Sequence, residues 1–170
     1  MALLSDPAIV DRKQQLDARA ARLAAADLLS RRAWTCAELS TRLRRRGAPP
    51  EVAAEVVADL TVRGYLDDAR FARQWVETRS ARGYGPARLA AELRARGVTV
   101  ALVRVALASR EPVAELERAR EVARRRLPAL RRAHPDRAAA RLRDHLLRRG
   151  FEAAMVARVV RELLGVADEV

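Results

Sequence analysis

The stretch Leu39-Ser40-Thr41-Arg42-Leu43-Arg44-Arg45-Arg46-Gly47 decides the fold, because the chain repeats its pattern twice more. Two leucines four residues apart, followed three residues later by Arg-Gly, return at residues 89–97 and 142–150. An apolar run at helical spacing follows each glycine. The glycines recur about every 50 residues, which indicates a repeated supersecondary unit that buries its apolar face against its neighbours.

Each repeat is predicted to contain three helices. In the first repeat we expect helices over about 17–32, from Thr35 to Arg46, and from Pro49-Pro50 to about 63. Thr35 and Glu38 form a capping box in which the Thr hydroxyl caps the second helix and Glu38 reaches back. This second helix, and its counterparts in the other repeats, should end at a glycine that adopts the left-handed conformation, at Gly47, Gly97 and Gly150.

The later repeats follow the same plan. In the second repeat, Asp67 or Asp68 caps the first helix, Pro86 opens the next, and the third runs over about 99–109. In the third repeat we expect helices over about 113–132, up to Arg149, and from 151 to about 164, with Pro128 disturbing the last turn of the first. No alternating apolar pattern predicts a strand.

We therefore predict an all-α fold of three tandem three-helix repeats, at residues 17–66, 67–112 and 113–170. Residues 1–16 form an N-terminal extension whose order, helical or disordered, the sequence leaves open. Four of the six aromatic residues lie between 65 and 84, which predicts the best-packed core there. Phe71 and Trp75 share one helix face, and we expect Tyr65 to pack beside them.

The composition favours a cytoplasmic protein without a membrane span. Cys36 is the single cysteine, which cannot form an internal disulfide and suits a reducing compartment. No apolar run approaches the ~18 residues of a membrane helix, and the N-terminus lacks the pattern of a signal peptide.

No motif for catalysis or for a bound group is present. The two histidines, His134 and His145, belong to no Cys/His cluster with metal-ligand spacing. There is no glycine-rich phosphate loop and no nucleophile elbow. The adjacent carboxylates of Asp67 and Asp68 are better explained as a helix cap than as an acid/base pair. We therefore expect no catalytic residue, no cofactor, no metal and no enzymatic activity.

The charge predicts an acidic or polyanionic partner. The net charge is +12, nearly all the basic residues are arginines, and the excess is concentrated between residues 67 and 149. Arginines in a last helical turn also oppose the helix dipole, so each one alone has a structural explanation. Their recurrence in three repeats suggests a basic stripe, and the candidate partner-binding residues at these helix ends are Arg44, Arg45, Arg46, Arg94, Arg96, Arg148 and Arg149. On the first helix of the third repeat, Arg118 and Arg125 are spaced to pair with Glu115 and Glu121. Arg126, Arg131 and Arg132 have no such acidic partner and are further candidates.

One segment resembles a known family. Gly64-Tyr65-Leu66-Asp67-Asp68-Ala69-Arg70-Phe71-Ala72 resembles the signature of the RecX family of bacterial regulatory proteins. The blocks Gly83-Tyr84-Gly85-Pro86 and Leu93-Arg94-Ala95-Arg96-Gly97-Val98 are also similar to that family. The resemblance covers roughly residues 20–165.

The resemblance implies a fold and a function. The fold would be three three-helix units in an elongated, curved, solenoid-like molecule. The function would be binding to RecA and to the RecA–single-stranded DNA filament, with inhibition of its recombinase, ATPase and co-protease activities, in control of DNA repair, homologous recombination and the SOS response. The protein would be a cytoplasmic monomer. The alternative is a basic helical protein that binds nucleic acid directly, independent of RecA, and contact of the arginines with the DNA backbone stays open in both cases.

Overall fold

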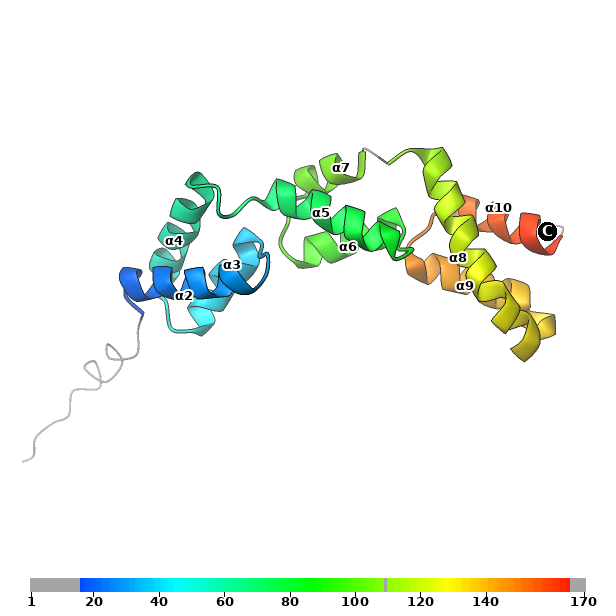
Figure 1. Ribbon diagram of the computed structural model, residues 1–170, viewed down its shortest axis with the longest axis horizontal. Helices are drawn as coiled ribbons and strands as arrows, with labels where there is room; N and C mark the ends of the chain where they lie inside the picture. Colours follow the sequence, from blue (N-terminus) through cyan, green and yellow to red (C-terminus); the bar gives the residue numbers. More distant parts are fainter. Residues whose placement is uncertain (1–15, 109, 166–170) are drawn as a thin grey trace, which may run out of the picture. The chain divides into compact units, whose positions relative to one another are not determined.

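The computed structural model describes residues 16–108 and 110–165, and these form helices α2 to α10 with one short 3-10 turn and no strand (Figure 1). The prediction of an all-α fold is confirmed. Contacts divide the chain into two compact units, Met1–Phe71 with Arg96–Val98 and Ala72–Ala95 with Thr99–Val170. The predicted N-terminal extension lies outside the described residues except for Leu16. Over the described ranges, no helix is long and apolar enough to cross a membrane.

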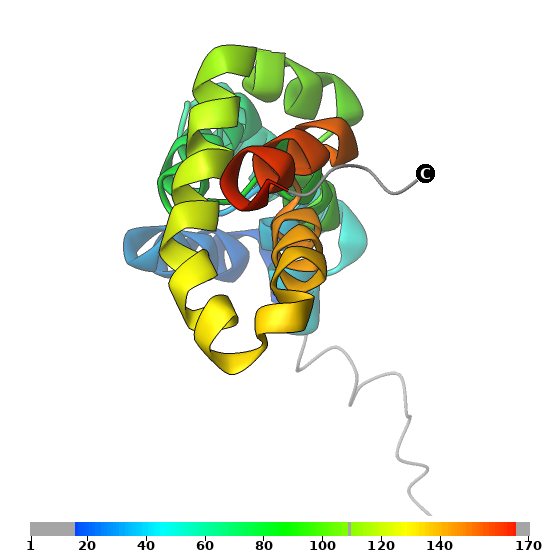
Figure 2. The ribbon, with the colours of Figure 1, turned by 90° about the vertical axis from the view of Figure 1, so that its right-hand side faces the viewer.

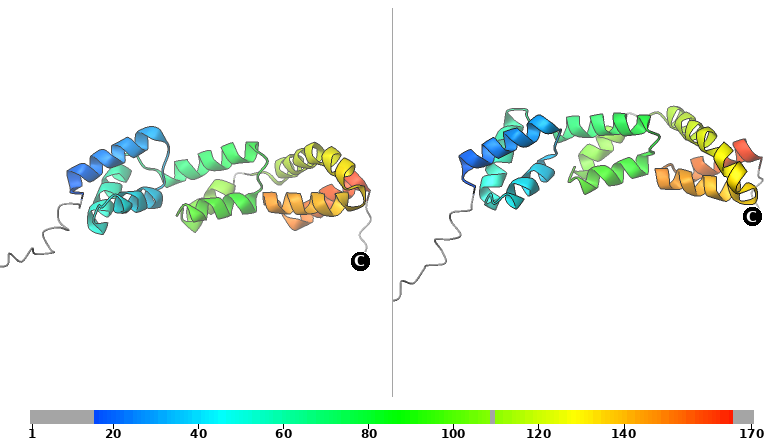
Figure 3. Two further views of the ribbon diagram at one scale, coloured as in Figure 1. Left: turned by 90° about the horizontal axis from the view of Figure 1, so that it is seen from below. Right: turned by 60° about the horizontal axis from the view of Figure 1, so that its bottom comes forward.

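In the first unit, three helices pack around one apolar core. These are α2 (Ala18–Arg31), α3 (Cys36–Arg45) and α4 (Pro50–Val62), and α2 lies against the other two (Figure 3). The leucines of the repeated pattern, Leu39 and Leu43, are fully buried together with Val56. Burial of one such side chain contributes about 1.5–3 kcal/mol relative to exposure.

Half of the predicted capping box is confirmed. The Thr35 hydroxyl accepts a hydrogen bond from the Glu38 amide at 3.1 Å. The expectation that Glu38 reaches back is wrong, because its carboxylate binds the guanidinium groups of Arg96 and Arg32. A charge-assisted bond of this kind is stronger than one to a neutral amide. A carboxylate also caps this helix, because the Cys36 amide at the start of α3 donates to a carboxylate oxygen of Asp68 at 2.9 Å.

The predicted helix ends are confirmed. Gly47, Gly97 and Gly150 have φ values of +95°, +80° and +90°, which is the left-handed region that favours glycine. Asp67 accepts a hydrogen bond from the Arg70 amide at 2.8 Å and so caps the helix that follows. The two adjacent carboxylates are therefore both used at helix starts, Asp67 on its own helix and Asp68 on α3.

The second unit contains the remaining helices. They are most of α5 (Asp68–Ala81), then α6 (Pro86–Ala95), α7 (Val100–Ala108), α8 (Pro112–Ala133), η1 (Pro135–Arg137), α9 (Ala138–Arg149) and α10 (Ala153–Leu164). Figure 2 shows α8 running beside α9 and α10, and the three share a core that includes Leu127, Leu142 and Leu146. Pro128 lies inside α8, and the helix continues past it to its predicted end.

The expectation for the aromatic residues is partly wrong. Tyr65 is 66% exposed, so it does not pack in the core. Phe71 is buried, whereas Trp75 is only half-buried and donates its indole N–H to Glu92 at 3.0 Å. The two apolar clusters formed by buried residues lie instead around α2–α4 and α8–α10, where leucines, valines and alanines make up most of the core and Phe151 is the one buried aromatic residue of these clusters.

Two of the repeated glycines also allow close backbone approach. A Cβ atom added at Gly97 would lie 2.3 Å from the Cβ of Ala37, at the start of α3. A Cβ added at Gly150 would lie 2.4 Å from the Arg88 backbone nitrogen, near the start of α6. A hydrogen bond to a backbone carbonyl accompanies each approach: the Thr35 hydroxyl donates to the Arg96 carbonyl, and the Gly85 amide donates to the Arg149 carbonyl at 2.7 Å. The Arg-Gly pairs at 96–97 and 149–150 thus each join the end of one helix to the start of an earlier one.

Candidate functional site

Most of the arginines predicted from the sequence are exposed. Arg44, Arg45, Arg94 and Arg132 form no ion pair with any described residue, so their charges are available to a partner. Arg46 lies 3.9 Å from Asp27, and Arg131 donates to the carbonyl of the C-terminal helix residue Leu163 at 3.1 Å. The predicted stripe joins arginines of both units and stays a prediction.

Arg96 and Arg149 have internal contacts instead. Arg96 is 29% exposed and forms an ion pair with Glu38. Arg149 donates to the Arg82 carbonyl at 2.8 Å and lies over the Tyr84 ring, with 4.9 Å from its guanidinium carbon to the ring centroid. These two arginines hold the Arg-Gly junctions in place, and their charges are only partly available to a partner.

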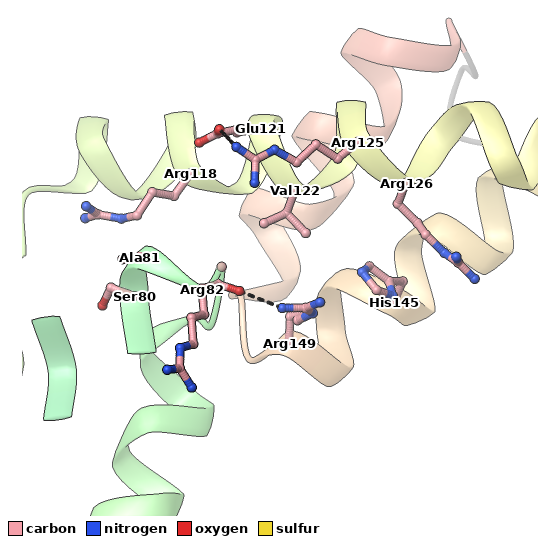
Figure 4. Close-up of a pocket in the computed structure, with 11 residues that line it drawn as sticks. Ser80, Ala81, Arg82, Arg118, Glu121, Val122, Arg125, Arg126, His145 and Arg149 are labelled. Atoms are coloured by element: carbon pink, nitrogen blue, oxygen red, sulfur yellow. Dashed lines mark hydrogen bonds and ion pairs between the residues drawn. The ribbon is translucent and has the colours of Figure 1, made fainter. Parts of the chain in front are cut away.

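Two of the arginine candidates, Arg126 and Arg149, line a pocket in the second unit. The pocket has a volume of about 340 Å³ and lies between the end of α5 and the helices α8 and α9. Figure 4 shows His145 between Arg126 of α8 and Arg149 of α9, with Val122 pointing from α8 towards Arg149. A second hollow of about 490 Å³ shares Arg126 and His145 with the first and is also lined by Arg148.

The ion pairs around the first pocket do not cancel its positive charge. Arg125 pairs with Glu121. Glu115 serves two guanidinium groups, those of Arg110 and Arg118, with a single carboxylate. The Arg118 Nε and one Glu115 oxygen are buried without a hydrogen-bond partner among the described residues. Of these two residues, Arg118 also lines the pocket.

The second hollow is also basic. Several of the arginines that line the two hollows form no ion pair with a described residue. The lining carboxylates are Glu121 in the first hollow and Asp144 in the second. The lining arginines without an ion pair to any described residue are Arg82, Arg126, Arg137, Arg141, Arg148 and Arg149. The two hollows together therefore form a concave surface with a large excess of positive charge.

The pKa of His145 is lowered in this basic surrounding. Its burial lowers the pKa of the imidazole below 6.5, and the positive charges of Arg149, Arg126 and Arg148 lower it further. These effects favour the neutral imidazole, which has one N–H donor and one acceptor nitrogen. Over the described residues, no group of three or more His, Cys, Asp or Glu side chains could hold a metal ion.

The sequence predicted only part of this site. Arg148 and Arg149 were predicted from the recurrence of arginine at helix ends, and Arg126 from its lack of an acidic partner, whereas Arg118 and Arg125 were assigned to local ion pairs with Glu115 and Glu121. Those pairs exist, but both arginines also line the pocket. The spacing of His145 and Arg149 on one helix face was a usable signal. The contribution of Arg82, from the end of α5, depends on tertiary packing and had no local signal.

A second polar cluster in the same unit is structural. The Glu92 carboxylate binds Arg79 at 2.7 Å, Arg88 at 3.0 Å and the Trp75 indole, and the arginines hold the pKa of this carboxyl at about 2. Tyr84 lies under the guanidinium groups of Arg79 and Arg88, at 4.2 and 4.6 Å from their carbons. This network links α5 to α6 and fixes the loop that precedes α6.

Comparison with known proteins identifies the family. The first, second and third three-helix domains of RecX match residues 21–60, 67–107 and 114–160. The chain belongs to the RecX family. Two similar curated proteins are each named "Regulatory protein RecX". The one from Thermobifida fusca is 44% identical over 81% of this chain and 75% of its own length. The one from Mycolicibacterium vanbaalenii is 39% identical over 92% of this chain and 88% of its own.

Solved RecX structures have the same fold. The crystal structure of RecX from Lactobacillus salivarius superimposes with a TM-score of 0.76, covering 88% of this chain and 97% of that one at 19% identity. A second crystal structure of a regulatory protein RecX gives a TM-score of 0.75, covering 89% of this chain and 74% of that one at 22% identity. The prediction of an all-α repeat fold of the RecX type is confirmed.

Proposed function

We propose that this protein binds RecA and the RecA–single-stranded DNA filament and inhibits the recombinase, ATPase and co-protease activities of RecA. In this way it would restrain homologous recombination, DNA repair and the SOS response in the cytoplasm. The observation that supports the proposal is the match of all three RecX domains, in order, along one chain. Relatives are named as regulatory proteins, which agrees with a regulatory role.

The exposed arginines supply a physical basis for binding. Arg44, Arg45, Arg94 and Arg132 present charged planar groups with no ion pair among the described residues. A guanidinium binds carboxylate and phosphate groups through two parallel hydrogen bonds, so an acidic face of RecA and the DNA backbone are both suitable partners. Because exposed charges are screened by salt, binding to the filament should weaken as the ionic strength rises.

The decisive experiment measures ATP hydrolysis by RecA from the same organism on single-stranded DNA, with this protein added after the filaments have formed. We expect a progressive loss of hydrolysis at less than one molecule per RecA protomer. No loss at an excess of this protein and low ionic strength would contradict the proposal. Binding to DNA in the absence of RecA would then be the function to establish.

A further inference from the structure

We propose that the hollow formed by the end of α5, α8 and α9 is a binding site for phosphate groups, centred on His145, Arg126 and Arg149 (Figure 4). The ligand class is a phosphate ester or pyrophosphate, carried either by a small molecule or by a nucleic-acid backbone. The inference goes beyond the proposed action on RecA and does not depend on it.

The shape of the surface suits a small polyanion. Two hollows of about 340 and 490 Å³ share Arg126 and His145, so one ligand or successive phosphates can occupy both. Each volume falls in the range of small-molecule sites, about 300–1,000 Å³. Walls from three helices exclude part of the solvent, which strengthens the attraction between a buried anion and the guanidinium groups.

The charge balance calls for a ligand with several negative charges. Arg126, Arg148 and Arg149 surround His145, and none of them forms an ion pair with a described residue. Arg118 adds a further excess because it shares its only carboxylate with Arg110. A single carboxylate from a protein would neutralise one of these groups, whereas a phosphate chain offers two or more charges and many acceptor oxygens at one point.

The chemistry of the lining favours phosphate over base recognition. The described residues that line the two hollows include no Phe, Tyr or Trp side chain on which a nucleobase could stack. Val122 and Leu130 are the largest apolar groups there. A nucleotide or nucleic acid bound here would therefore be held through its phosphates, without preference among bases.

The test follows the imidazole signals of the full-length protein by NMR while pyrophosphate is added at constant ionic strength. The chain has only two histidines, so His145 reports on the pocket and His134 serves as an internal reference. We expect a saturable shift of the His145 signals and little change at His134. A linear, non-saturating change at both histidines would overturn the proposal, because it would show only general attraction of anions to a basic protein.

Matched variants locate the site. Arg126→Glu with Arg148→Glu reverses two lining charges that have no ion pair with described residues, so the fold should be kept. Arg73→Glu with Arg104→Glu makes the same change in net charge, on exposed arginines of α5 and α7 outside both hollows. We expect the first pair to weaken pyrophosphate binding by about tenfold or more and the second by less than about threefold. Equal weakening by both pairs would refute a localised site.

Competition identifies the source of the phosphate. ATP and a short oligothymidylate are each added to the pyrophosphate complex, and an oligoglutamate of matched charge serves as the carboxylate probe. Displacement mainly by ATP assigns the site to free phosphate compounds, and displacement mainly by the oligonucleotide assigns it to a nucleic-acid backbone. Tighter binding of the oligoglutamate than of any phosphate probe would overturn the proposal. Because RecA is absent from all these assays, their outcome is separate from that of the RecA ATPase experiment.

Discussion

Replacement of Gly97 by alanine tests the close approach between the Arg96-Gly97 junction and the start of α3. The new methyl group would lie 2.3 Å from the Ala37 Cβ, and the backbone at Gly97 has a φ of +80°. The positive φ alone costs about 1–2 kcal/mol for a residue with a Cβ, partly offset by the lower entropy of the unfolded chain. The steric overlap adds about 1–3 kcal/mol, because neither the Ala37 methyl nor the helix that carries it can move aside freely.

Gly64→Ala is the matched control. Gly64 belongs to the same compact unit and has a φ of +76°, but an added Cβ there would have no atom within 4 Å. The two substitutions therefore share the conformational cost and differ in the overlap. Ala37→Gly combined with Gly97→Ala removes the overlapping atom, so the double variant should recover most of the difference between the two single variants.

The assay is urea unfolding of the full chain, monitored by tryptophan fluorescence. All variants carry Trp75→Phe, so that the signal comes only from Trp34 and reports the unfolding of the first unit. With an m-value near 1 kcal/mol per M for a unit of this size, Gly97→Ala should lower the midpoint by about 1–3 M more than Gly64→Ala. Equal midpoints for the two variants would refute the close approach. Failure of Ala37→Gly to restore stability would place the cost elsewhere.

Three further outcomes follow from the polar contacts. Glu92→Gln should lower the stability of the second unit by about 2 kcal/mol at pH 7, because the hydrogen bonds that depress the pKa of Glu92 stabilise its ionised form in the folded state. In pH-dependent urea unfolding, the difference from the parent protein should vanish as the pH falls from about 4.5 to about 2. An NMR titration should give His145 a pKa below the ordinary histidine value of 6.5. Because the unfolded chain binds that proton more readily than the folded one, protonation of His145 should reduce the stability of the protein as the pH falls below about 6.5. Arg96→Ala should lower the stability of the first unit by about 1 kcal/mol by removing the ion pair with Glu38, whereas Arg94→Glu, on an exposed side chain, should leave thermal unfolding nearly unchanged.

The helices could be predicted from the sequence because their ends are decided locally. Thr35, Gly47 and Asp67 act on backbone groups within a few residues of themselves, and each occupies the position that the sequence indicated. Glu38 and Asp68 were harder, because each bonds a group far along the chain in preference to its own helix. Tyr65 was misplaced for a related reason, since aromatic residues gathered in sequence need not face the same core.

The candidate site could be predicted only in part. Composition showed that arginines outnumber their acidic partners, and the three Arg-Gly pairs showed where many of them lie. Local spacing does not tell which arginines are used internally: Arg94 and Arg96 are two residues apart, yet Arg94 is exposed and Arg96 is paired with Glu38. The pocket depends on the packing of α5 against α8 and α9, which no local pattern specifies.

The arginines of the three Arg-Gly pairs fall into two groups: some hold the structure together, and others are exposed and can bind a partner. Where the glycine approaches an earlier helix, as at Gly97 and Gly150, the arginine before it is held by a carboxylate or a carbonyl. At Gly47 the preceding Arg46 is exposed, and its contact with the Asp27 carboxylate is a long one of 3.9 Å. Charge-reversal experiments on this protein should therefore avoid Arg96 and Arg149, because loss of binding in such variants would report loss of the junction. Variants at Arg44, Arg94, Arg126 and Arg148 change the surface and leave the junctions intact, so they measure recognition of the partner itself.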